Sequence, residues 1–261
     1  METKQTKLTE MQMENMVATT MKPLLVSQIV RNDYRTADVF KKWGINYCCG
    51  GNLPLAEACA IKNIDAESLE TDLQAATKTV SIPNALKFAE WPVLFLVDYI
   101  TYVHHGYVKR VLPLLSQQIT SFVPGHIKKY PYLAKVEESF SNLAAELLEH
   151  TQKEEESIFP YLKQVANTFD RKEVYGSLFV RTMRQPLFEV INREHNRISE
   201  LLTELREQTN SYSFADNACT NHQVIYHKLK EFDDDLVQHK HLENNILYPK
   251  ALEMEKYLLG I

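Results

Sequence analysis

A stretch of eleven residues occurs twice in this chain and constrains its fold more than any other feature. The first copy is HTQKEEESIFP at 150–160, and the second is HKHLENNILYP at 239–249. In both copies a glutamate follows the first histidine by four residues: Glu154 follows His150, and Glu243 follows His239. Because positions i and i+4 lie on one face of a helix, each copy directs an imidazole and a carboxylate to the same point.

Two further histidines extend this duplication. His105 lies 45 residues before His150, and His195 lies 44 residues before His239. The two half-patterns therefore repeat at an offset of 90 residues (195 − 105) or 89 residues (239 − 150). An up-down helical bundle with such nearly equal spacing returns each histidine to the same level of its core.

The hydrophobic periodicity predicts an all-α chain with a four-helix bundle. Apolar residues recur at helical spacing in four long segments, and no strand pattern competes with them. Only 7 glycines occur in 261 residues, which favours long helices over a turn-rich β fold. The four helices are expected at about 92–119, 132–166, from 186 onward, and 217–254.

We expect three parts along the chain. Residues 1–22 form a polar tail, 23–79 a small helical N-terminal domain, and 80–261 the four-helix bundle with the duplicated histidines. Short helices are expected within the small domain at 36–43, from 53 to 59, and at 66–76. Gly44 is a plausible stop for the first of them, and Asp65 a cap for the third.

Charge and hydropathy exclude several classes of partner. The net charge is −5 and no basic block occurs, which argues against nucleic acid or an anionic membrane as the main partner. No apolar run approaches the ~20 residues of a membrane-spanning helix. The first sixteen residues lack the apolar core of a signal peptide. These observations predict a cytoplasmic protein.

Six residues are candidate metal ligands. They all lie on helical stripes that are otherwise apolar: His105, His150, Glu154, His195, His239 and Glu243. A single histidine on such a stripe is more often a core residue. Buried carboxylates, however, need a cation or a hydrogen-bond partner. The duplicated arrangement therefore predicts a dinuclear metal site.

The chemistry of these side chains suggests the metal. Imidazole and carboxylate without thiolate suit iron or manganese better than structural zinc. If Glu154 and Glu243 both bridge, each ion has two imidazoles and two carboxylate oxygens. A bridging oxo or hydroxo group makes five ligands, and one position of an octahedral ion stays open to a small molecule.

Charged residues near the candidate ligands receive weaker assignments. Glu155 and Glu156 are expected on a solvated face, and His104 points away from the direction of His105 by about 100°. Asp98, seven residues before His105, is a candidate for orienting that imidazole. A surface carboxylate is an equal alternative for Asp98.

Cys48 and Cys49 adjoin each other and precede two glycines. Adjacent cysteines rarely form an unstrained disulfide, because their Cα atoms are only ~3.8 Å apart. The pair is either a reactive dithiol that exchanges with a metal or a redox partner, or a buried structural pair. Residues alone do not separate these two interpretations. Cys59 and Cys219 are expected to be core thiols.

Together these features resemble the repair-of-iron-centres family, of the ScdA/YtfE type. The segment YCCGG at 47–51 and the segment LAEAC at 55–59 resemble the short N-terminal domain of that family. The six candidate ligands resemble those of its hemerythrin-like domain. The resemblance implies a di-iron protein with two non-haem iron ions that helps to repair iron–sulfur clusters damaged by oxidative or nitrosative stress. It also implies that the paired cysteines contribute to activity and that the partners are iron–sulfur proteins with damaged clusters.

An alternative function stays open. A hemerythrin-like enzyme or sensor would bind or reduce nitric oxide or dioxygen at the iron site. Oxygen-carrying hemerythrins resemble this bundle but have an extra histidine one turn after the third-helix ligand, where this chain has Ser199. Reversible oxygen carriage is therefore not expected. A homodimer is a further possibility that the sequence leaves open.

Overall fold

The computed structural model describes residues 24–48, 51–79, 86–183 and 187–261. The chain divides into two compact units. The first comprises residues 1–80 with 219–224, and the second comprises residues 81–218 with 225–261. Within the described residues all regular structure is helical, apart from one isolated bridge between Leu25 and Pro54. The predicted all-α class is thus confirmed, whereas the predicted tail at 1–22 lies outside the described residues.

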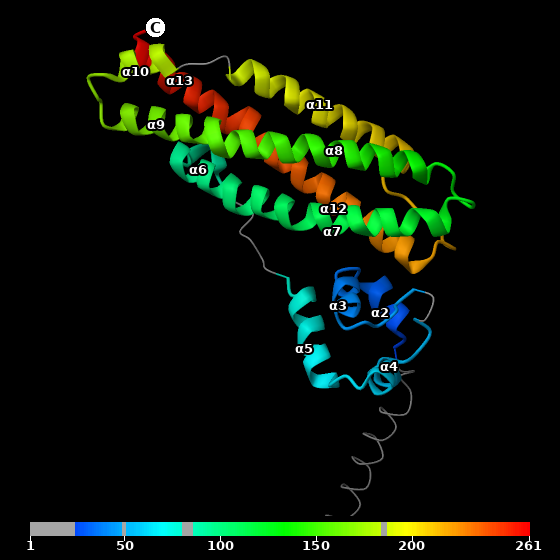
Figure 1. The fold of residues 1–261 in the computed structure, drawn as a ribbon. Coiled ribbons are helices and arrows are strands. Elements are labelled where there is room, and N and C mark those ends of the chain that lie inside the picture. Colours follow the sequence, from blue (N-terminus) through cyan, green and yellow to red (C-terminus); the bar gives the residue numbers. More distant parts are fainter. Residues whose placement is uncertain (1–23, 49–50, 80–85, 184–186) are drawn as a thin grey trace, which may run out of the picture. The chain divides into compact units, whose positions relative to one another are not determined.

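Short helices build the first unit (Figure 1). They are α2 (Val26–Asn32), α3 (Thr36–Lys42), α4 (Leu55–Lys62) and α5 (Ala66–Thr77). Helix α3 is followed by Gly44, whose φ of +67° lies in the left-handed region that glycine adopts without strain. Helix α5 is capped by Asp65, whose side chain accepts a hydrogen bond from the Ser68 backbone N–H at 3.0 Å. Fully buried Phe40 and Leu69 anchor the core of this unit.

The bundle of the second unit consists of four long helical segments, here called rods, each made of one helix or of several in continuous succession (Figure 1). The first is α6 (Val93–Tyr99), η2 (Ile100–His105) and α7 (Gly106–His126). The second is α8 (Leu133–Lys153), η3 (Glu154–Ile158) and α9 (Phe159–Asp170). The third is α11 (Leu187–Gln208), and the fourth is α12 (Thr220–Leu242), η4 (Glu243–Leu247) and α13 (Tyr248–Leu259). Helix α8 packs against both α7 and α11.

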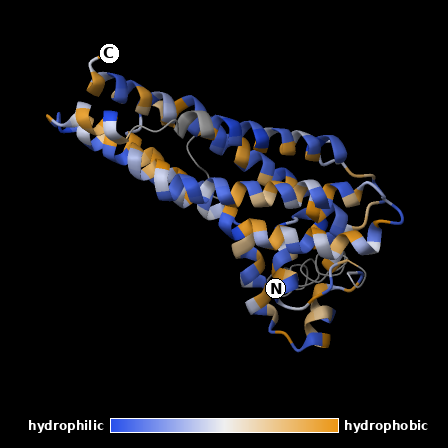
Figure 2. Cartoon of the chain, turned by 45° about the horizontal axis from the view of Figure 1, so that its top comes forward, coloured by the Kyte–Doolittle hydropathy of each residue, from blue (hydrophilic) through white to orange (hydrophobic). Residues whose placement is uncertain are grey.

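Hydrophobic and hydrophilic residues are interspersed along the bundle helices (Figure 2), as expected of amphipathic helices that bury one face. Their apolar stripes meet in a core at one end of the bundle that includes fully buried Leu96, Leu162 and Leu247. Among the described residues, no helix is both long enough and apolar enough to cross a membrane.

Two prolines lie inside the duplicated rods rather than near their ends. Pro160 and Pro249 each fall in the first turn of an α-helix that follows a π-helical segment. Proline is tolerated in the first turn of an α-helix, where it interrupts few backbone hydrogen bonds. The rods therefore continue to Asp170 and Leu259, beyond the predicted ends at 166 and 254.

The sequence pattern missed two helical elements. One is α10 (Gly176–Met183), which lies between the second and third rods, and the other is α2 in the first unit. Both are short, and helices of one or two turns show too few repeats of the 3.6-residue period to stand out. The turn η1 (Phe88–Glu90) precedes the first rod.

Candidate metal centre

Six buried side chains converge in the middle of the bundle, and they are the six that the sequence singled out. Two overlapping groups place their donor atoms within 4.8 Å of one another. We call the first group position A: His105, His239, Glu154 and Glu243. We call the second position B: His150, His195, Glu154 and Glu243. The two glutamates are common to both, and each is 0 % exposed.

Three of these residues lie where the helices are locally π-helical. His105 ends η2, Glu154 begins η3, and Glu243 begins η4. In η3 the Phe159 N–H donates to the Glu154 carbonyl five residues earlier, and in η4 the Tyr248 N–H donates in the same way to the Glu243 carbonyl. Such a turn holds one residue more than an α-turn, so it changes where the following side chains point. Short π-segments are frequent at functional sites.

Position A brings two imidazoles and two carboxylates within contact distance. The Nε2 atoms of His105 and His239 are 3.1 Å apart. His105 Nε2 lies 3.3 Å from Glu154 Oε2, and His239 Nε2 lies 2.9 Å from Glu243 Oε1. All four side chains meet around one point through their Nε2 and carboxylate oxygen atoms.

Position B repeats this geometry on the other side of the same glutamates. The Nε2 atoms of His150 and His195 are 3.0 Å apart. His150 Nε2 lies 3.4 Å from Glu154 Oε2, and His195 Nε2 lies 3.3 Å from Glu243 Oε2. The internal duplication of the sequence is therefore a duplication of the site.

The donor set fits a pair of octahedral metal ions. Adjacent ligands about 2.1 Å from such an ion lie about 3.0 Å apart, which matches the spacing of the imidazole nitrogens. The Oε2 atoms of Glu154 and Glu243 are buried and have no hydrogen-bond partner among the described residues. Buried carboxylate oxygens without such a partner are costly unless a cation is bound between them.

The electrostatics of the protein alone favour charged groups at this site. Burial opposes a charge on His105, but the carboxylates of Glu154, Glu243 and Glu155 outweigh it and raise the pKa of the imidazole. Burial also opposes a charge on His195, and Glu243 with Glu154 again raises the pKa.

The Glu243 carboxylate responds in the opposite direction. Burial would raise the pKa of Glu243, but His239 and His195 hold it well below the usual range. Without a metal, the protonated imidazoles of His105 and His195 and the Glu243 carboxylate thus stabilise one another's charges.

Two glutamates outside the cluster orient imidazoles through Nδ1. His105 Nδ1 donates to Glu155 Oε1 at 2.9 Å, and His150 Nδ1 donates to Glu194 Oε2 at 3.0 Å. A lysine contacts each carboxylate: Lys109 Nζ lies 2.6 Å from Glu155 Oε2, and Lys153 Nζ contacts Glu194 Oε1. Such partners fix the ring and leave Nε2 as the lone-pair donor toward the centre.

Asn244 and Tyr248 complete the hydrogen bonds around the centre. His195 Nδ1 donates to Asn244 Oδ1 at 2.7 Å. The buried phenol of Tyr248 donates to Glu154 Oε1. Burial and the charge of Glu154 both raise the pKa of Tyr248, which keeps the phenol protonated as a donor.

The structure corrects one sequence assignment near His105, that of Glu155, and decides between the two alternatives for Asp98. Glu155 is not on a solvated face, because its carboxylate binds the imidazole. Asp98 is half-exposed and binds Lys163 Nζ at 2.7 Å, so it pairs with a lysine and Glu155 takes the orienting role. A helical wheel places Glu155 about 100° from Glu154, and the first rod packs close enough to reach it. Sequence periodicity within one helix carries no signal for that contact.

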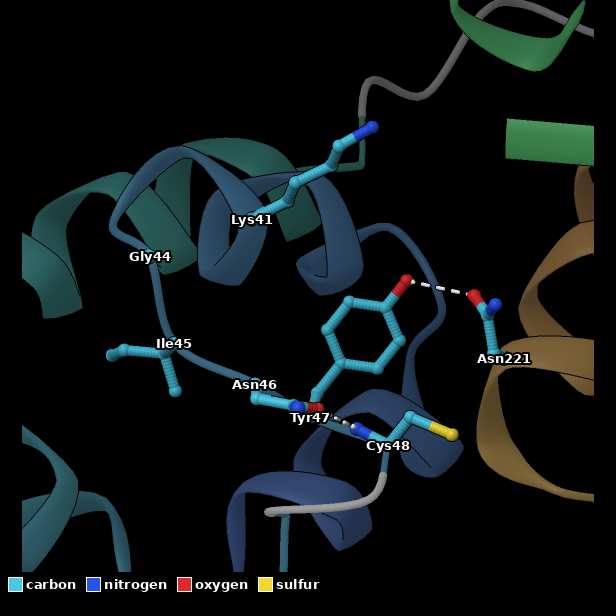
Figure 3. Close-up of a pocket in the computed structure, with 7 residues that line it drawn as sticks. All are labelled: Lys41, Gly44, Ile45, Asn46, Tyr47, Cys48 and Asn221. Carbon is cyan, nitrogen blue, oxygen red and sulfur yellow. Dashed lines mark hydrogen bonds between the residues drawn. The ribbon is translucent and has the colours of Figure 1, made fainter. Parts of the chain in front are cut away.

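The cysteine pair is described only in part, because Cys49 and Gly50 lie outside the described residues. Cys48 is partly exposed and lines a pocket of about 320 Å³ in the first unit (Figure 3). Its backbone N–H donates to Asn46 Oδ1 at 3.0 Å. Tyr47 shares the pocket wall, and its hydroxyl donates to Asn221 Oδ1 at 3.1 Å.

The other two cysteines differ in burial. Cys59 is 4 % exposed, and burial raises the pKa of its thiol, which is the behaviour expected of a core cysteine. Cys219 is only partly buried. Cys59 therefore matches the expected core thiol, whereas Cys219 does not lie fully in a core.

Both units match known protein families. Residues 25–77 match a family described as "Domain of Unknown function (DUF542)", and residues 97–251 match "Hemerythrin HHE cation binding domain". The second match spans more than half of the chain and contains all six converging residues.

Curated relatives match over most of both chains. "Iron-sulfur cluster repair protein YtfE" of Escherichia coli O157:H7 is 31% identical over 221 residues, which are 85% of this chain and 93% of the relative. The protein of the same name from Shigella boydii matches to the same extent. "Iron-sulfur cluster repair protein ScdA" of Staphylococcus haemolyticus is 27% identical over 226 residues, 87% of this chain and 96% of the relative.

Proposed function

This chain belongs to the ScdA/YtfE family of iron–sulfur cluster repair proteins, and from that membership we propose that it binds two iron ions and donates iron to damaged clusters. One observation carries the proposal. Two carboxylates that are 0 % exposed meet four imidazoles in two equivalent groups at the middle of the bundle. That arrangement is strongly unfavourable without cations and well suited to a pair of them.

Each of the six residues would have a definite role in holding the ions. Glu154 and Glu243 would bridge the two ions, and two imidazoles would hold each ion at positions A and B. Bound iron supplies a redox-active Lewis acid that exchanges with other ligands. A site of nitrogen and oxygen donors, without thiolate, binds ferrous iron less tightly than a sulfur-rich cluster site would. This difference favours transfer of iron from the bundle toward a cluster.

Substitution of one proposed bridging glutamate tests the iron site directly. Glu154→Gln removes the charge of a proposed bridge with little change of shape, and Glu156→Gln makes the same change on the exposed face two residues away, where the Gln152 amide binds Glu156 Oε1 at 2.8 Å. We expect the first variant to lose iron and repair of a damaged cluster, and the second to keep both. Two irons per chain in Glu154→Gln would contradict the proposed bridge.

The dithiol is the second part of the proposal. Cys48 lies at the wall of an open pocket, where a thiol can reach a partner. We expect Cys48→Ser with Cys49→Ser to keep the iron of the bundle but lose repair activity. Cys59→Ala, which changes a buried thiol of the same unit, is the control and should keep both. Full repair by the double variant would remove the dithiol from the mechanism.

A second candidate function also has support in the geometry. Among the described residues, four side chains meet at each metal position, so an octahedral ion would keep positions for a small ligand such as nitric oxide or dioxygen. Rapid mixing of the ferrous protein with nitric oxide separates the two functions. Catalytic consumption favours an enzyme, whereas stoichiometric binding without turnover favours iron donation.

A further inference from the structure

The duplication extends beyond the ligands to the residues that orient them. The offset of 89 makes Asn244 the counterpart of Glu155 (244 − 155), and the offset of 90 makes Glu194 the counterpart of His104 (194 − 104). These four positions adjoin ligands in the sequence, and each is a candidate to hold the Nδ1 atom of one imidazole.

The first pair of counterparts, Glu155 and Asn244, makes the same kind of hydrogen bond in both halves. Glu155 Oε1 accepts from His105 Nδ1 at 2.9 Å, and Asn244 Oδ1 accepts from His195 Nδ1 at 2.7 Å. Each of these residues directly follows a bridging glutamate and reaches the histidine that opens its own half-pattern. One imidazole of position A and one of position B are thus fixed.

The second pair of counterparts differs. Glu194 Oε2 accepts from His150 Nδ1 at 3.0 Å, which fixes the other imidazole of position B. By the duplication, His104 should hold His239 in the same way, but its Nδ1 binds Asp235 Oδ1 at 3.0 Å instead. Its ring stacks parallel on that of His239, with centroids 5.5 Å apart and 7° between the planes.

His239 is consequently the exception among the four imidazoles. Its Nδ1 atom is buried and has no hydrogen-bond partner among the described residues. A parallel ring presents its face to that of His239 and offers no acceptor in the plane where an N–H points. Position B thus has two oriented imidazoles and position A has one.

We propose that the two metal positions hold iron unequally, and that position A, between His105 and His239, is the one that releases its ion. An outer hydrogen bond raises the basicity of a ligating imidazole and fixes its ring, and losing one typically lowers metal affinity about 10- to 100-fold. The inference rests on the proposed function, because it requires both positions to bind iron. It assigns donation to one ion while the other holds the bundle together.

Iron release from the loaded protein tests the inference. The full chain, loaded with ferrous iron without oxygen, is mixed with an excess of a colorimetric ferrous chelator, and release is followed with time. We expect two phases of one iron each, with rates about 10- to 100-fold apart. A single phase that releases both ions would overturn the inequality.

Two matched variants assign the phases. Glu155→Ala and Glu194→Ala each remove a carboxylate that an imidazole and a lysine contact, the first at position A and the second at position B. We expect Glu155→Ala to accelerate only the fast phase, and Glu194→Ala to accelerate the slow phase until the two merge. The reverse assignment would refute the proposal. Circular dichroism of both metal-free variants controls for folding.

Substitutions of His104 test whether the lack of a hydrogen-bond acceptor for His239 Nδ1 causes the faster release of iron. His104→Gln puts an amide oxygen on the position that Glu194 occupies in the other half, whereas His104→Phe keeps a stacking ring and supplies no acceptor. Slower fast-phase release in the glutamine variant alone supports the proposal. Equal slowing in both variants would show that packing on His239, and no hydrogen bond, sets the rate.

The assay contains no cluster, so it separates this inference from the proposed function. Two unequal irons in a protein that repairs nothing would leave the inequality standing and contradict iron donation. Repair by a protein whose two irons leave together would do the opposite. A chain that binds fewer than two irons would overturn both.

Discussion

Removal of the Tyr248 hydroxyl isolates the contribution of one hydrogen bond to the metal centre. In the structure this phenol donates to Glu154 Oε1, and both side chains are buried. Tyr248→Phe deletes one oxygen atom and keeps the ring, so the apolar packing of the helix stays. Position 159, the counterpart of 248 in the first copy, already carries phenylalanine, which shows that the duplicated backbone accommodates that ring.

The size of the effect follows from the burial of the acceptor. A hydrogen bond to an ionised group contributes about 1.5–3 kcal/mol, and Glu154 has no access to water that could replace it. The metal-free chain should lose stability of about that size, and iron affinity should fall about 10- to 100-fold, as is typical when the outer hydrogen-bond partner of a metal ligand is removed. The loss applies to both metal positions, since Glu154 belongs to each.

The assay is chelator competition at equilibrium on the iron-loaded chain, with thermal unfolding of the metal-free chain alongside. Tyr161→Phe is the matched control, because its hydroxyl donates to buried Glu255 Oε1 at 2.7 Å outside the six-residue cluster. Both variants should lose stability, but only Tyr248→Phe should lose iron affinity. Unchanged affinity in Tyr248→Phe, or an equal loss in the control, would refute the reasoning.

Three further outcomes are expected. Pro249→Ala restores a backbone N–H after the π-segment η4 and permits a regular α-turn there. Such a turn would rotate Glu243 by about 100° relative to the following residues. Iron content should therefore fall, while the helical circular dichroism signal should persist. Asp65→Ala removes the cap of α5 and should shift urea unfolding of the first unit to a lower urea concentration; no change would mean that the cap contributes nothing. In the metal-free chain the raised pKa values of His105 and His195 give a stabilisation that is full below their ordinary value of 6.5 and is lost as pH rises through the folded values. Melting temperature should therefore fall from pH 6 to pH 8, and a rise over that window would contradict the sign.

The unequal surroundings of the two positions also bear on how a duplicated site can specialise. His150 and His239 occupy equivalent places in the repeat, yet Glu194 holds the first and no described side chain holds the second. A histidine at position 104, where the other half of the repeat has Glu194, is enough to leave His239 without an acceptor among the described residues. Each of these outer residues contacts a single imidazole, so the other three keep their partners. A symmetric ligand set can thus give two ions of different lability.

Residue spacing alone determined the helices of the bundle and the six side chains that meet in its core. A polar residue on the apolar stripe of a helix faces the core together with that stripe. The periodicity of each helix was therefore sufficient to predict that these six side chains are buried. Only the tertiary structure decided which side chains orient those six. Glu155, Glu194 and Tyr248 act across helices, on His105, His150 and Glu154, and the π-segments shift the faces that a regular helix would present. The physical reason is that local spacing specifies direction around one helix axis, whereas a hydrogen bond between helices depends on how closely and at what height their axes pack.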